Sequence, residues 1–138
     1  MKRRSVFPLA ALPLMAAPAA ETPAKKWPNV TMDAKKARRV PDPSGELLIY
    51  HEGPTDMLKL MVAGSLRLKP GMSPHPPHAH PEEEFMVVTE GTGWIEIEGK
   101  RTEVGPGSLM YCDGNKPHAI MNTGKTPMLF YFYKWLGK

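Results

Sequence analysis

The sequence predicts an all-β protein with one domain of ordinary size. Short apolar runs recur along residues 44–138, with clusters of turn-forming residues between them and no long amphipathic helical pattern. Residues 94–98 (WIEIE) alternate apolar and polar side chains, which places Ile95 and Ile97 on the core face of a strand. Many short strands at this spacing indicate a sandwich or a barrel. The chain shows no internal repeat, so we expect a single barrel.

The apolar runs define the expected strands, and the polar clusters define the turns. Strands are expected over residues 46–51, 57–68, 84–89, 94–98, 101–104, 108–112, 118–122 and 128–135. Gly, Pro, Asn and Asp separate them, as in Gly91-Thr92-Gly93 and Asp113-Gly114-Asn115. The last run is rich in aromatic residues, and we expect it to supply core and a homodimer interface more than a substrate cage.

The first 43 residues differ in composition from the barrel segment. Residues 1–19 are interpreted as a signal peptide, because a basic start precedes an apolar stretch that is too short and too rich in proline for a membrane anchor. Ala17 and Ala19 are suited to cleavage after Ala19. The pair Arg3-Arg4 resembles a twin-arginine signal, and a general secretory signal is the alternative. These features predict an exported protein, periplasmic or secreted, with no stable membrane anchor.

Residues 20–43 are expected to form a polar arm before the barrel, with a role in pairing with a neighbouring subunit as one alternative. The whole chain has 18 Lys and Arg against 14 Asp and Glu. Removal of Lys2, Arg3 and Arg4 with the signal peptide leaves 15 against 14, so the charge gives little support for nucleic-acid binding. A basic cluster at residues 35–39 of the arm is interpreted as a solvated segment.

Three histidines and one glutamate form a pattern that predicts a metal site: His78, His80, Glu84 and His118. In an extended chain His78 and His80 point to the same side, and Glu84 keeps that parity unless Pro81 bends the chain. Imidazole and carboxylate ligands suit one Fe(II), Mn(II), Ni(II), Zn(II) or Co(II) ion, and four such ligands leave two positions open on an octahedral ion. A structural zinc site usually has several thiolates, and this chain has one cysteine.

The polar residues next to this pattern are not expected to bind the metal. The histidine pair lies in a proline-rich stretch, where His75 is expected on the rim or in the loop, and Glu82 and Glu83 are expected in solvent or at a strand edge. Cys112 cannot form an intramolecular disulfide, and we interpret it as a small buried hydrophobic residue, with a place near the metal as the alternative.

The two segments that contain these ligands resemble the two motifs of the cupin superfamily. The first is GMSPHPPHAHPEEEFMVVTEG (71–91), with one residue more than usual between Gly71 and His78. The second is GSLMYCDGNKPHAIMN (107–122), in which Asp113 and Asn115 replace the motif proline and a motif glycine. The resemblance covers about residues 45–134 and implies a small single-domain cupin, a double-stranded β-helix or jelly-roll barrel over residues 44–138. It also implies that His78, His80, Glu84 and His118 are the metal ligands.

The resemblance does not select a reaction, because one fold supports many chemistries. The leading expectation is an enzyme acting on a small oxygenated molecule, with a dioxygenase as first choice and a metal-dependent isomerase, decarboxylase or lyase as the alternative. A non-catalytic module that binds a metal or a small molecule is the second class of function. Arg67 and Tyr50 are candidates for substrate contact, although the alternative for Arg67 is an outward position in solvent.

Overall fold

The structure is a computed structural model that describes residues 27–138. The predicted signal peptide and the first residues of the predicted arm lie outside this range. The described elements are a short 3-10 helix, η1 (Ala34–Lys36), and the strands β1 (Arg38–Asp42), β2 (Gly45–Gly53), β3 (Leu58–Leu68), β4 (Glu83–Glu90), β5 (Gly93–Ile97), β6 (Lys100–Val104), β7 (Leu109–Cys112), β8 (His118–Asn122) and β9 (Met128–Gly137). Within residues 27–138 we find no helix long and apolar enough to cross a bilayer.

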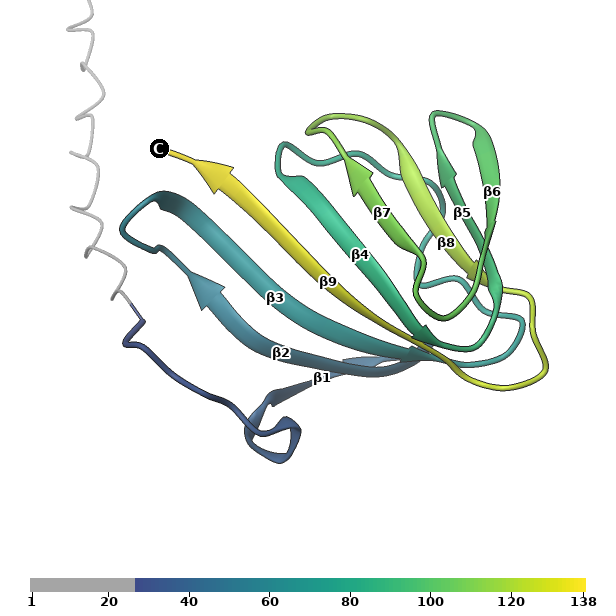
Figure 1. Cartoon of the computed structure of the whole chain (residues 1–138), viewed down its shortest axis with the longest axis horizontal. Helices are drawn as coiled ribbons and strands as arrows, with labels where there is room; N and C mark the ends of the chain where they lie inside the picture. Colours follow the sequence, from purple (N-terminus) through teal and green to yellow (C-terminus); the bar gives the residue numbers. More distant parts are fainter. Residues whose placement is uncertain (1–26) are drawn as a thin grey trace, which may run out of the picture.

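The strands form two antiparallel sheets that face each other as the walls of a barrel (Figure 1). The larger sheet has the order β1-β2-β3-β9-β4-β7, and the smaller one has the order β6-β5-β8. The C-terminal strand β9 lies between β3 and β4, so the end of the chain joins two strands that are consecutive in sequence. This arrangement confirms the predicted all-β jelly-roll barrel.

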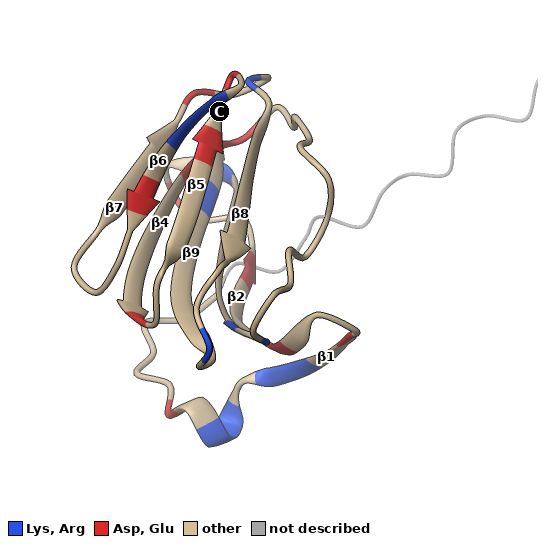
Figure 2. Cartoon of the chain, turned by 90° about the vertical axis from the view of Figure 1, so that its right-hand side faces the viewer, with Lys and Arg blue, Asp and Glu red and all other residues tan. Residues whose placement is uncertain are grey.

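One strand was not expected. Residues 38–42, predicted to belong to the polar arm, pair with β2 as strand β1. Their sequence RRVPD shows no clear apolar alternation, because β1 is an edge strand whose charged side chains remain exposed. Ion pairs from Arg38 to Glu52 and from Arg39 to Glu46 connect it to β2. Figure 2 shows the positive charge of this region on η1 and β1.

The hydrophobic core fills the space between the two sheets. Leu68, Val88, Ile120 and Met128 are completely buried there, and Ile95 is 4% exposed. Ile97 is partly buried against the same cluster, so the expectation from the alternating segment is confirmed. Residues of one parity on each strand thus face the barrel interior, and the other parity faces outward.

The connection between β3 and β4 runs along β8 and covers the free edge of the smaller sheet. Gly71 N donates to Asn122 O (2.9 Å), Asn122 N donates to Met72 O (3.0 Å), and Ser73 Oγ donates to Ile120 O (2.7 Å). Farther along, His78 and His118 exchange two backbone hydrogen bonds of 3.1 and 2.9 Å. The long connection is therefore held in a single path, with backbone partners that an edge strand would otherwise lack.

Asn122 holds the far end of β8. Its side chain is completely buried, and its Nδ2 donates to Leu68 O (3.0 Å) and to Thr126 O (2.9 Å), while its Oδ1 accepts from Gly124 N (2.9 Å). One side chain thus satisfies groups at the end of β3 and in the turn between β8 and β9.

Replacing Asn122 with alanine should lower the free energy of unfolding by about 2 to 4 kcal/mol, because buried carbonyl and amide groups lose their partner. Denaturant unfolding of Asn122→Ala measures the change. The matched control is Thr123→Ala, an exposed neighbour that should change stability by less than about 0.5 kcal/mol. Equal stability of the two variants would contradict the assigned role of Asn122.

Candidate metal centre

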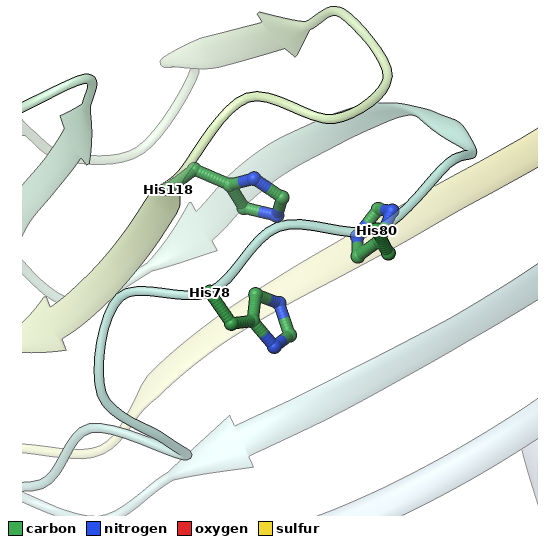
Figure 3. Close-up of side chains that lie close together, drawn as sticks. All are labelled: His78, His80 and His118. Carbon is green, nitrogen blue, oxygen red and sulfur yellow. The ribbon is translucent and has the colours of Figure 1, made fainter.

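Three imidazole rings lie close together (Figure 3). His78 and His80 come from the connection between β3 and β4, and His118 is the first residue of β8. One ring nitrogen from each lies within 4.8 Å of the others. His118 is buried, His80 is partly buried and His78 is exposed. The backbone bridge between His78 and His118 brings together rings that are far apart in sequence.

Glu84 joins this cluster from the start of β4. Its side chain faces the interior, and its Oε2 lies 2.9 Å from Nε2 of His80 and 2.9 Å from Nε2 of His118. Burial of Glu84 favours the neutral carboxyl, but hydrogen bonds and charge from His118 and His80 outweigh it and lower the pKa of Glu84. The carboxylate is therefore ionised at neutral pH and available as a ligand.

The other nitrogen of each of these two rings is occupied. His118 Nδ1 lies 3.0 Å from Lys116 O, and His80 Nδ1 lies 3.1 Å from Glu82 O, with the Glu82 carboxylate at 3.2 Å. An N–H at Nδ1 donates to these oxygens, so the Nε2 lone pair becomes available to a metal when Nε2 loses its proton. Partners of this kind set the tautomer and the orientation of metal-binding histidines.

The pKa values of His78 and His118 shift in opposite directions. Although the residue is exposed, desolvation of part of its ring, followed by the charges of His75, His118 and His80, lowers the pKa of His78 to about 4, so the ring is neutral at pH 7. The hydrogen bond from Glu84 raises the pKa of His118, against the opposing effect of burial. Without a metal ion, the hydrogen bond between them stabilises the protonated ring of His118 and the ionised carboxylate of Glu84.

These residues fit a divalent ion. Adjacent ligands on an octahedral ion with bonds near 2.1 Å lie about 3 Å apart, which is the spacing of Glu84 Oε2 from two of the ring nitrogens. The donors are imidazole nitrogen and carboxylate oxygen, and a neutral His78 has a free lone pair. The cluster His78, His80 and His118 can therefore hold a metal ion, and Glu84 Oε2 lies beside two of its rings.

His75, Glu82 and Glu83, which were not expected to bind the metal, differ from one another in their contacts. The ring of His75 stacks on His78, with centroids 3.6 Å apart, so it lies beside the cluster. Glu82 is not a solvated side chain, because its side chain is 15% exposed and close to His80. Glu83 points outward and accepts hydrogen bonds from Tyr111 and Trp135.

Cys112 has a buried thiol that contacts the ring of His118. It is 2% exposed, and its Sγ lies 3.6 Å from His118 Nδ1, on the side of the ring away from Glu84. Burial and the negative charge of Glu84 raise the pKa of this thiol, so it remains protonated at neutral pH. Cys112 therefore packs as a small apolar residue and supports the His118 ring.

The cluster opens into a cavity of about 200 Å³ inside the barrel. His78, His80 and Glu84 form one wall, and the remaining lining is mostly apolar: Leu47, Leu66, Pro74, Met86, Ile120, Phe130 and Phe132, with His75, Asp42 and Lys134 as polar members. Neither candidate for substrate contact is among the lining residues. Arg67 is exposed and pairs with Glu90, and Tyr50 lies beside Ser65 and Tyr131 on another surface.

Sequence reasoning missed part of this lining. The aromatic strand β9 was assigned to core and interface, yet Phe130 and Phe132 line the cavity, and Lys134 follows with the same parity. Alternation along residues 128–134 contained the signal, because every second residue from Met128 faces inward. Asp42 gave no comparable signal, since its position depends on the pairing of β1 with β2.

The chain belongs to the cupin domain family. The family model, described as a cupin domain, matches residues 64–133, which include both motif segments and all four candidate ligands. A search of curated proteins finds no match.

Several solved structures share the fold. A RmlC-like cupin from Shewanella frigidimarina superposes with a TM-score of 0.64 at 13% identity, covering 80% of this chain and 94% of that one. The polyketide cyclase RemF from Streptomyces resistomycificus gives a TM-score of 0.62 at 20% identity, covering 78% and 79%. A predicted oxalate decarboxylase from Thermotoga maritima gives 0.59 at 22% identity, covering 78% and 99%. At these identities the likeness concerns the fold.

Replacing His78 with alanine should weaken metal binding by about 100-fold or more, because it removes a neutral ligand of the cluster. The matched control is His75→Ala, which removes the stacked ring but no ligand and should weaken binding by less than about 10-fold. Competition with a chromophoric chelator measures both affinities. Equal losses in the two variants would argue against His78 as a ligand.

Metal binding should become weaker as the pH falls. Because the pKa of His118 is raised, its proton competes with the metal up to a higher pH than that of an ordinary histidine, whereas His78 stays neutral down to about pH 4. Below the raised pKa of His118, that one proton should lower the affinity by about tenfold per pH unit. Calorimetric titrations in buffers of different ionisation enthalpy count the released protons, and affinity independent of pH between 5 and 8 would contradict this assignment.

Proposed function

We propose that this chain is an exported cupin enzyme that holds one divalent metal ion and acts on a small oxygenated molecule, with dioxygenation as the first choice. The proposed metal ligands are His78, His80, Glu84 and His118. One observation carries the proposal: two residues of the cluster able to hold a metal, His78 and His80, line a small, mostly apolar cavity together with Glu84. A purely structural metal site has no need of such a cavity.

The residues around the cluster have separable roles in this proposal. Lys116 and Glu82 orient the rings of His118 and His80 through their carbonyl oxygens. Phe130 and Phe132 provide an apolar wall that limits the entry of water. When bound, the ion supplies Lewis acidity and, if it is iron, redox chemistry toward dioxygen.

The size of the cavity favours a small substrate. Its volume of about 200 Å³ lies below the range of about 300–1,000 Å³ that is usual for ligand pockets. This size favours a molecule with a single ring or a short chain. The names of two structural neighbours, a polyketide cyclase and a predicted oxalate decarboxylase, favour an enzyme without selecting one reaction.

Export and dimerisation remain parts of the proposal. Export follows from residues 1–19, which lie outside the described residues. A homodimer is expected from the outward side chains of β9, where Tyr133 is an exposed aromatic residue.

Elemental analysis of the purified protein and of His80→Ala should give about one metal ion per chain in the first and much less in the second. Stoichiometric iron, with oxygen uptake on phenolic or thiol substrates, is the expected result. Stoichiometric manganese, zinc or nickel with no oxygen uptake would replace dioxygenation with an isomerase, decarboxylase or lyase activity. Absence of a metal from both proteins after growth with each of these ions would overturn the proposal.

A further inference from the structure

Lys134 is the one cationic side chain among the residues that line the cavity. It lies on β9 directly opposite Glu84 of β4, and opposite residues in an antiparallel pair project from the same face of the sheet. Its charge acts on His118, since it opposes the rise in the pKa of that ring that the hydrogen bond from Glu84 causes. The ammonium is therefore near the candidate metal ligands.

Among the described residues, the side-chain ammonium of Lys134 has no hydrogen-bond or ion-pair partner. Several other lysines do, including Lys69, Lys116 and Lys138. The neighbours of its own parity on β9 are Phe130 and Phe132, which offer no acceptor. A half-buried cation beside apolar walls is costly unless an anion pairs with it.

The two carboxylates that line the cavity are already engaged. Asp42 Oδ1 accepts hydrogen bonds from Ser44 N (2.8 Å) and Ser44 Oγ (2.5 Å). Glu84 Oε2 contacts His80 and His118. Neither forms an ion pair with Lys134, so the chain itself leaves this cation available to a molecule inside the cavity.

We propose that Lys134 is a specificity-determining residue that binds a carboxylate of the substrate, which makes the substrate a small oxygenated acid. The inference rests on the proposed function, because it assumes that the metal cluster holds the oxygenated end of the same molecule. A carboxylate suits the site better than a phosphate, since a single ammonium matches one negative charge and the cavity is small.

The test uses the Zn(II)-loaded protein and two probes that differ by one charge. The probes are 3,4-dihydroxybenzoate and 3,4-dihydroxybenzamide, which share a pair of adjacent oxygens suited to a metal, and zinc does not oxidise them. Calorimetry measures the affinities of both for the wild type, Lys134→Met, Lys134→Arg and the control Lys125→Met. Lys125 is exposed in the turn before β9, outside the cavity lining.

The wild type and Lys125→Met should bind the acid about tenfold or more tightly than the amide, the range expected for a hydrogen bond to a charged group. Lys134→Met should lose this preference while it keeps its zinc and its affinity for the amide. Lys134→Arg should retain a preference for the acid, because the positive charge remains.

The outcomes separate the two proposals. A wild type that takes up no Zn(II), Fe(II), Mn(II) or Ni(II) would contradict the proposed function before any probe is added. A zinc-loaded wild type without preference for the acid, or with no binding of either probe, would overturn the assignment of Lys134. So would a preference for the acid that persists in Lys134→Met, because it would show that another group binds the carboxylate.

Discussion

The candidate metal centre depends on a pair of backbone hydrogen bonds between His78 and His118. These bonds join the connection after β3 to the first residue of β8, and they place two candidate ligands from distant segments side by side. The same contact covers the edge of the smaller sheet, so the hydrogen bonds that close this edge of the barrel also bring the site together. A change in this backbone register would separate the rings as well as open the edge.

The two faces of strand β9 have different functions. Its inward residues Phe130, Phe132 and Lys134 complete the cavity, while Tyr133 and Trp135 project outward beside Glu83. Because β9 pairs with both β3 and β4, it is held on both sides over most of its length. The position of Lys134 opposite Glu84 is thus set by a long, regular ladder and not by a flexible loop.

Most of the fold was predictable, because its strands have a half-buried pattern and end at turn-forming residues. Ile95 and Ile97 illustrate this, since alternation alone placed them in the core. The strand β1 was not predictable in this way. Its residues Arg38 and Arg39 form ion pairs with β2, and an exposed edge strand carries no apolar pattern. Likewise, the contact of Glu82 with His80 depends on the bend after Pro81, which parity along an extended chain does not describe.

By itself the sequence determined the barrel class and the four candidate ligands, because strand periodicity and ligand spacing are local properties of the chain. Only the tertiary structure decided which other side chains lie beside these ligands. Arg67 and Lys134 are both cations on strands of the same sheet, yet one pairs with Glu90 outside and the other faces the cavity. That difference follows from how β3 and β9 align with their neighbours, since pairing across the sheet decides which face of each strand turns inward.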